Sequence, residues 1–500
     1  MAGGPTEAPG PALRLTWVQP EDLVGHELAQ AAQDGRDAGA VERRWLAAGG
    51  HRAPERAGAS PAPASPALRR LAEELLDELA ALPSPLAARE PTELAAIRTA
   101  CPNWPTSPAR SARPERELPE RELPALDRPA LDRLEAAWLG RAAGCVLGKP
   151  VEKLPLAAIR ELARAAGNWP LNDWFTERGV PAELLAAHPW NRRSAPTSLA
   201  ENIDGAPEDD DLNYPLLNLL LLRRHGTDFT TADVAGLWLD ELPAGRTFTA
   251  ERVAYRNLLA GIEPPATATR RNPFREWIGA QIRADAFGWT HPGDPGRAAE
   301  LAHRDAVLTH TANGVYGAMF VAATVAVAMA GEDDVHACLA AGLDVVPPGS
   351  RYAAAVRLGV ATARAHGDPG DPGSFDAVVD ALHARFADHH WVHVLPNAAL
   401  LAAALTHADG DFTGSVCRAV AAGLDTDSNG ATAGSVAGAL AGAPKALPER
   451  WTAPLRNRLA SSVANFDGIG FDALAALTRE VSAPTPGADT PEAPTLEGTP

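Results

Sequence analysis

Lysine is almost absent from this chain of 500 residues: only Lys149, Lys153 and Lys445 occur, and arginine supplies the remaining positive charge. Acidic residues outnumber basic ones by 63 to 45, so the formal net charge is −18. Clustered Lys and Arg are what bind the phosphates of nucleic acids. The charge balance therefore argues against a nucleic-acid-binding protein.

Cysteine is also scarce, with four widely spaced residues and no C-x-x-C pair. Neither a thiolate zinc site nor a disulfide framework is indicated. The longest apolar run, residues 318–330, is too short to span a bilayer, and residues 1–13 lack the basic and apolar regions of a secretory signal. We expect a cytoplasmic protein, with no membrane partner and monomeric.

Proline-rich stretches divide the chain. Residues 1–125 combine helical spacing of apolar residues, at 17–48 and 68–82, with Pro/Ala-rich linkers, and we assign them to an N-terminal extension. Residues 483–500 have the composition of a disordered tail. Between them, over 130–482, helical patterns dominate without alternation of strands and helices. This pattern predicts an all-α fold in a single large domain.

The first helix of that domain, at about 131–150, has small residues on one face: Gly140, Ala143, Gly144 and Gly148. Small residues permit the close approach of another helix or of a ligand. Glu152 follows directly after the helix gives way at Pro150.

A loop with two acids and a hydroxyl, Asp425, Asp427 and Ser428, precedes an uncharged Ala/Gly-rich run at 431–443. Converging oxygen atoms of this kind suit a hard cation. An EF-hand is excluded, because Val436 stands where that motif needs a bidentate glutamate. Other ligands must therefore come from elsewhere in the chain. The alternative is a helix N-terminus with aspartate caps.

A second acidic cluster, at 208–211, precedes an apolar helix at 215–222. Acids at a helix N-terminus also favour the helix dipole, which is the simpler explanation for this cluster. Two clusters of oxygen ligands without nearby His or Cys suit Mg²⁺ or Mn²⁺ rather than zinc. Four or more carboxylates are enough for two ions.

In combination, these motifs resemble the ADP-ribosylglycohydrolases, relatives of dinitrogenase-reductase-activating glycohydrolase and of mammalian ADP-ribosyl-acceptor hydrolases. The resemblance covers about 130–482 and rests on G-x-x-x-G-x-x-x-E at 144–152, on E-D-D-D at 208–211 in place of T-D-D-T, and on G-x-D-T-D-S at 423–428. The third motif is specific; the other two persuade only beside it. A weaker match is H-T-A-N-G-V-Y-G at 310–317.

The resemblance implies an orthogonal multi-helix fold and a site with two Mg²⁺ ions, or Mn²⁺. It implies release of ADP-ribose from an ADP-ribosylated protein or small molecule by cleavage at C1″ of the distal ribose. Glu152 and Asp210 are the candidates for the carboxylate that positions or deprotonates water. The implied metal ligands are Glu208, Asp209, Asp210, Asp425, Asp427 and Ser428. The implied substrate-binding residues are His310, Asn313, Gly314 and Tyr316.

Two features depart from the family pattern. Cys145 stands where many members have Asp, and the second motif carries a charge at each end, at Glu208 and Asp211, where the family has hydroxyls. Two other functions therefore stay open: a catalytically silent relative that binds ADP-ribose or packs structurally, and a hydrolase of a different N- or O-riboside.

Other residues have competing interpretations. His389, His390 and His393 are a possible metal cluster or a partly buried helix or strand end. Trp169, Trp174 and Trp190 are either rim packing or stacking surfaces for an adenine. Asn397 begins a helix, where its expected role is capping.

Overall fold

The computed structural model describes residues 14–52, 58–60, 62–106 and 128–482. Within these residues it contains 22 α-helices, several short 3-10 turns and no β-strand, so the predicted all-α class is confirmed. The expected disorder at 1–13 and 483–500, and the repeat PERELPERELP at 114–124, lie outside the described residues.

The helices of the N-terminal extension are α1 (Pro20–Gln33), α2 (Gly39–Ala47), α3 (Pro66–Ala81) and α4 (Leu94–Ala100). The first half of the main body has α5 (Arg128–Gly148), α6 (Leu156–Ala165), α7 (Ala182–Ala187), α8 (Ala195–Ser198), α9 (Asp210–His225), α10 (Thr231–Glu241), α11 (Thr249–Leu259), α12 (Asp285–Trp289) and α13 (Pro295–Ala306). The second half has α14 (Ala312–Met329), α15 (Val335–Asp344), α16 (Arg351–His366), α17 (Phe375–Arg385), α18 (Val394–His407), α19 (Phe412–Ala421), α20 (Thr426–Ala441), α21 (Glu449–Thr452) and α22 (Phe471–Ser482).

One local expectation was wrong. The helical pattern at 17–48 is two helices, because the chain turns at Gly35, which has a φ of +72°. Residues 291–294 form a turn that leads into α13: the Asp294 carboxylate accepts a hydrogen bond from the backbone N–H of Arg297 (3.0 Å), and Pro295 occupies the first turn. Aspartate at the cap and proline at the first position are standard helix-start signals.

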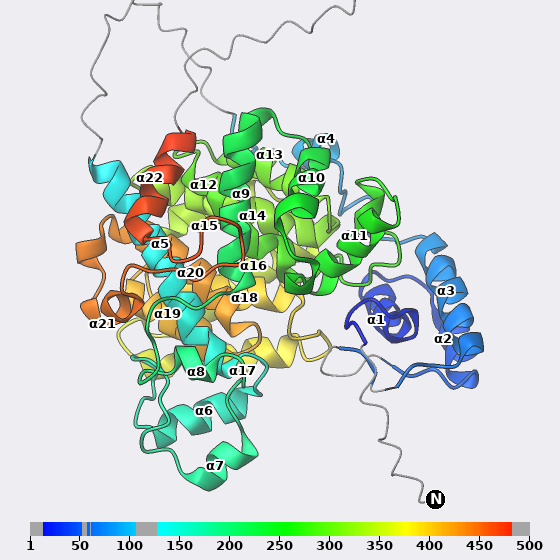
Figure 1. Ribbon diagram of the computed structural model, residues 1–500, viewed down its shortest axis with the longest axis horizontal. Coiled ribbons are helices and arrows are strands. Elements are labelled where there is room, and N and C mark those ends of the chain that lie inside the picture. Colours follow the sequence, from blue (N-terminus) through cyan, green and yellow to red (C-terminus); the bar gives the residue numbers. More distant parts are fainter. Residues whose placement is uncertain (1–13, 53–57, 61, 107–127, 483–500) are drawn as a thin grey trace, which may run out of the picture.

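Helices α5 and α20 pack backbone against backbone at the centre of the main body (Figure 1). A Cβ added at Gly144 would lie 1.9 Å from the carbonyl oxygen of Gly430, and one added at Gly140 would lie 2.1 Å from that of Gly434. Residue numbers rise along one helix as they fall along the other, so the pair is antiparallel. The C-terminal end of α5 therefore meets the N-terminal end of α20.

A buried arginine joins two further helices to this pair. Arg141 of α5 is fully buried and donates to the backbone carbonyl of Asp211 in the first turn of α9 (2.9 and 2.7 Å). The same guanidinium donates to the Asp285 carboxylate of α12 (2.8 Å). A buried ion pair of this geometry fixes positions strongly, because removing one partner leaves an unpaired buried charge. Arg141 thus sets where α9 begins relative to α5.

Helix α14 is 18 residues long and apolar enough to cross a membrane by length and composition. The apolar run counted in the sequence covered only part of this helix. In the fold, 94% of α14 is buried inside the protein, so its apolar surface is covered by neighbouring helices such as α13 and α15.

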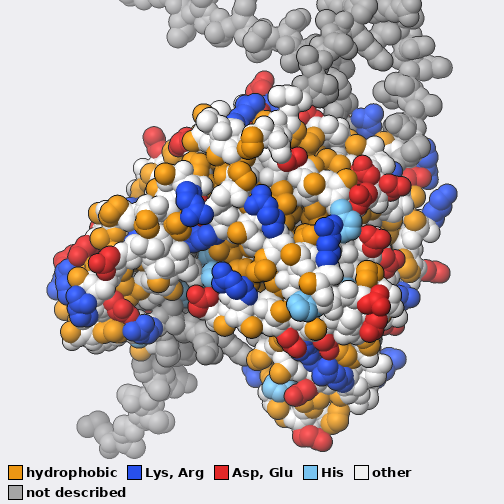
Figure 2. All heavy atoms as spheres, turned by 180° about the vertical axis from the view of Figure 1, so that it is seen from behind, with side chains coloured by type: hydrophobic (Ala, Val, Ile, Leu, Met, Phe, Trp, Pro, Cys, Tyr) orange, Lys and Arg blue, Asp and Glu red, His pale blue; other side chains and the backbone are white. Residues whose placement is uncertain are grey.

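The N-terminal extension packs on the main body at two places. Helices α1, α2 and α3 form a lobe beside α11, whereas α4 lies near α13 (Figure 1). In the lobe, Glu27 of α1 pairs with Arg275 (2.8 Å), and near α4 Arg98 pairs with Glu300 of α13 (3.1 Å). Seen from behind, several Lys and Arg side chains lie over the middle of the visible face, and Asp and Glu side chains gather toward its right-hand side (Figure 2).

We predict that Gly144→Ala destabilises the protein. The added methyl overlaps the backbone of α20, and overpacking of this kind costs about 1–3 kcal/mol or more. The control is Gly236→Ala on the exposed face of α10, where a Cβ has open space and alanine favours the helix by up to about 1 kcal/mol. Urea denaturation of both variants checks this, and equal stability of Gly144→Ala and the unaltered protein would contradict it.

Candidate functional site

A cavity of about 690 Å³ opens at the junction of α5, α9 and α20. Its walls come from residues 149–153, 191–197, 207–213, 246–251, 278–282, 391–392 and 425–428, and from Trp17 of the N-terminal extension. This volume lies within the usual range of small-molecule sites, about 300–1,000 Å³.

The first acid group joins the end of α5 to the start of α20. Glu152, Asp425 and Asp427 each offer an oxygen, and the three oxygens lie within 4.8 Å of one another. The Thr426 hydroxyl donates to the carbonyl oxygen of Gly148 (2.8 Å) and so ties the two helix ends together. The antiparallel packing of the glycine faces thus brings together carboxylates that are more than 270 residues apart in sequence.

Burial makes this group electrostatically costly on its own. Burial, and then the neighbouring Glu152 carboxylate, raise the pKa of Asp425 to about 7. The same two causes raise the pKa of Asp427 well above its usual range. Because buried like charges repel and a nearby cation relieves that repulsion, three converging carboxylate oxygens fit a hard divalent ion.

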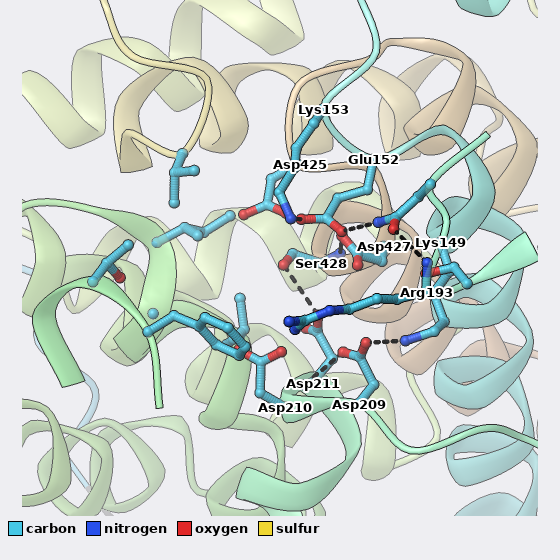
Figure 3. A pocket seen from close by; sticks show the side chains of 18 of the residues that line it. Lys149, Glu152, Lys153, Arg193, Asp209, Asp210, Asp211, Asp425, Asp427 and Ser428 are labelled. Atoms are coloured by element: carbon cyan, nitrogen blue, oxygen red, sulfur yellow. Dashed lines mark hydrogen bonds and ion pairs between the residues drawn. The ribbon is translucent and has the colours of Figure 1, made fainter. Parts of the chain in front are cut away.

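The second acid group comes from the start of α9. Asp209 caps this helix by accepting from the backbone N–H of Asp211 (3.0 Å). The capping alternative stated for the 425–428 loop differs: Asp425 is the N-cap of α20, but its side chain makes no capping hydrogen bond. Asp209, Asp211 and Cys145 offer atoms within 4.8 Å of one another. Figure 3 shows Asp209, Asp210 and Asp211 facing Glu152, Asp425 and Asp427 across the cavity.

The second acid group already has partners within the protein. The Lys149 ammonium pairs with Asp209. The Ser428 hydroxyl donates a hydrogen bond to Asp211 (3.1 Å). Burial alone would raise the pKa of Asp209, but Lys149 holds it below its usual range. Burial, and then Asp209, raise the pKa of the Cys145 thiol well above its usual range.

The remaining predicted metal ligands line the same cavity. Asp210 lies on the α9 side of the cavity with Asp209 and Asp211, and burial followed by the charge of Asp209 raises its pKa well above its usual range. Glu208 pairs with Arg246 at 2.9 Å and belongs to neither candidate group. Ser428 lies beside Asp211, with its hydroxyl engaged as described.

Basic side chains line the cavity beside the acids. They are Lys149, Lys153, Arg192, Arg193 and Arg246. Lys153 pairs with Glu152 at 2.6 Å, and the Arg193 side chain reaches into the space between the two acid groups (Figure 3). The cavity therefore offers positive charge as well as metal-ligating oxygen.

The four predicted substrate-binding residues lie elsewhere. His310, Asn313, Gly314 and Tyr316 are buried at the start of α14 and are not among the residues that line the cavity. Residues 90–92 of the N-terminal extension contact two of them. Asn313 donates to Glu90 (2.9 Å) and Tyr316 donates to the carbonyl oxygen of Pro91 (2.5 Å). The local sequence around 310–317 contains no sign of these contacts.

Sequence reasoning missed the role of Asn397. The N-cap of α18 is His393, so the expected capping role of Asn397 is wrong. Its buried side chain instead donates to the carbonyl oxygen of Trp391 (2.8 Å) and accepts from the backbone N–H of Asp425 (3.3 Å). Asn397 thus holds the acid loop against a cavity wall.

The residues of the possible histidine metal cluster and of the possible tryptophan stacking surfaces do not line the cavity. Neither candidate metal group found among the described residues contains histidine; His390 stacks on Trp277 (4.3 Å between ring centroids) and His389 pairs with Asp388. Trp169, Trp174 and Trp190 do not line the cavity, whereas Trp17 and Trp391 do. The sequence signal for Trp17, an isolated tryptophan before a helix, was too weak to find it.

Part of the backbone strain lies at the cavity. Non-glycine residues with positive φ include Trp17 (+69°), Lys153 (+72°) and Thr249 (+37°), which all line it, and Leu424 (+63°), which precedes Asp425. Such conformations cost about 1–3 kcal/mol each and persist where the surrounding structure holds them, commonly at functional sites.

Comparison with known proteins identifies the family of this chain. Residues 127–484 match the family model described as ADP-ribosylglycohydrolase. A solved structure titled "ADP-ribosylglycohydrolase-related protein complex" is similar over 71% of this chain and 100% of its own, with 21% identity and a TM-score of 0.43. No curated protein matches the chain. The family model covers well over half of the sequence and includes both acid groups, so this chain belongs to the ADP-ribosylglycohydrolase family.

Proposed function

We propose that this protein is a Mg²⁺-dependent hydrolase that cleaves the C1″ bond of ADP-ribosylated proteins or small molecules and releases ADP-ribose. The observation that carries the proposal is the convergence of Glu152, Asp425 and Asp427 opposite Asp209–Asp211 in one cavity. Family membership supports the reaction class. Unused buried acids would be costly, which weighs against a purely structural relative.

Glu152, Asp425 and Asp427 would hold the first ion. When bound, Mg²⁺ supplies orientation of the ribose hydroxyls and a lowered pKa for a bound water. Asp210 lies across the cavity from Glu152, where its carboxylate would position or deprotonate the attacking water. Arg192, Arg193 and Arg246 offer guanidinium groups suited to a diphosphate.

A panel of ADP-ribosyl conjugates that differ in the acceptor group tests the reaction directly. We expect free ADP-ribose to be released from an arginine-, serine- or nucleobase-linked conjugate with Mg²⁺ and not with EDTA, because the chelator removes the ion held by the first acid group. Chromatography of released ADP-ribose measures this. Binding of ADP-ribose without release from any conjugate would favour a catalytically silent protein that binds ADP-ribose. Turnover of another N- or O-riboside would favour a hydrolase with a different substrate.

We predict that Asp427→Asn loses both metal and activity. The substitution keeps the shape of the side chain but removes one of three converging charges. The expected loss in Mn²⁺ affinity and in rate exceeds the roughly 10–100-fold that changes around metal ligands typically cost. Calorimetric Mn²⁺ titration and the release assay measure it. The control is Asp380→Asn, an exposed aspartate of α17 that pairs with Arg160 outside the cavity; unchanged metal affinity in Asp427→Asn would refute the assignment.

A two-ion centre would place the second ion beside Asp209 and Asp210. Lys149 already pairs with Asp209, so the second ion must compete with that ammonium. We expect Mn²⁺ titration to show two unequal affinities, and Lys149→Met to tighten the weaker one. A single affinity that Lys149→Met leaves unchanged would argue for one ion.

A further inference from the structure

Trp17 stands outside the family-like part of the chain and yet lines its cavity. The family model begins at residue 127, more than 100 residues later. Trp17 is 9% exposed and is the only residue of the described N-terminal extension that lines this cavity. The extension therefore contributes to the site as well as to packing.

Two arginines of α11 hold the segment that carries Trp17. Arg252 donates to the Thr16 hydroxyl at 2.6 Å, and Arg256 donates to the carbonyl oxygen of Val18 at 3.5 Å. Helix α11 starts at Thr249, which itself lines the cavity. The segment is thus attached on both sides of Trp17 to an element that forms the cavity wall.

The Trp17 ring is fixed in an aromatic cluster. Phe274 and Trp277 meet it edge to face, with ring centroids 5.4 and 5.9 Å away. Its backbone has a φ of +69°, a conformation that a bulky residue adopts only where its surroundings hold it. The packing of the ring against Phe274 and Trp277 therefore holds this strained backbone conformation.

The same cluster continues into the apolar part of the cavity lining. Ile278 follows Trp277 and donates from its backbone N–H to the carbonyl oxygen of Val392 (3.0 Å), next to Trp391. Ile278, Val392 and Trp391 all line the cavity with Trp17. The cavity therefore combines carboxylates and arginines with an apolar, tryptophan-rich wall.

We propose that Trp17 is a substrate-binding residue, and that the apolar wall to which it belongs takes the planar nucleobase of the substrate. Aromatic side chains bind nucleobases by stacking, without requiring hydrogen-bond readout of the base. The inference rests on the proposed function for the substrate class, since an ADP-ribosyl substrate carries adenine at one end and the scissile ribose at the other. In this proposal the acid groups act at the ribose, and Trp17 binds the base by stacking.

The test is calorimetric titration of the full chain with ADP-ribose, AMP and ribose 5-phosphate in the presence of Mg²⁺. We expect Trp17→Ala to weaken ADP-ribose and AMP binding about tenfold or more, the effect typical of losing one stacking partner. Ribose 5-phosphate has no base, so its affinity should not change. Trp17→Phe keeps an aromatic ring and should lose less.

The matched control is Trp104→Ala. Trp104 belongs to the same extension, is half-buried against Gly296 and does not line the cavity, so all three affinities should stay unchanged. Thermal melting of each variant shows whether the fold is intact. Thr16→Val, which removes the acceptor for Arg252 but keeps the ring, should weaken ADP-ribose binding less than Trp17→Ala.

Equal ADP-ribose affinity in Trp17→Ala and the unaltered protein would overturn the inference. So would an equal loss for ribose 5-phosphate, because the ring would then act through folding of the segment, or a failure of the unaltered protein to bind either nucleotide. Nucleotide binding that depends on Trp17, without release of ADP-ribose from any conjugate, would instead overturn the proposed reaction and keep the base-binding role.

Discussion

The contact between the glycine faces of α5 and α20 is the constraint on which the site depends. Gly140 and Gly144 meet Gly434 and Gly430 so closely that a single methyl group would collide with the opposite backbone. Because the helices are antiparallel, this contact places Glu152, just after α5, beside Asp425 and Asp427 at the start of α20. Larger residues on these faces would separate the helices and therefore the carboxylates. The small residues thus affect the site only by setting the distance between the two helices.

The second constraint on the site is the negative charge of its buried carboxylates. The start of α9 brings three further acids to the cavity, and a buried protein interior does not tolerate so much negative charge without compensation. Arg141 and Lys149 supply part of that compensation from within the chain, both beside the α9 acids. Raised pKa values remain on both sides of the cavity, at Asp210 and at Asp425 and Asp427, and a divalent ion would relieve the repulsion that raises them. The two acid groups differ in their cations: Lys149 is buried against Asp209, whereas Lys153, which pairs with Glu152, is half exposed.

The N-terminal extension has two effects on the site. Residues 90–92 contact the start of α14 and take up Asn313 and Tyr316 in contacts with the extension. Trp17 forms part of the cavity wall. The extension therefore changes which residues line the cavity and which residues of α14 are buried.

The sequence by itself determined the all-α class, the two acidic motifs and the small-residue helix faces, because each depends on local composition and helical spacing. It also led, through the family resemblance, to Glu152, Asp209, Asp210, Asp425 and Asp427, which the structure gathers around one cavity. Only the tertiary structure decided that His310 and Asn313 are buried and do not line the cavity, that Asn397 supports the acid loop rather than capping a helix, and that Trp17 reaches the cavity. These outcomes depend on contacts between segments that lie far apart in sequence, and no local pattern specifies such contacts.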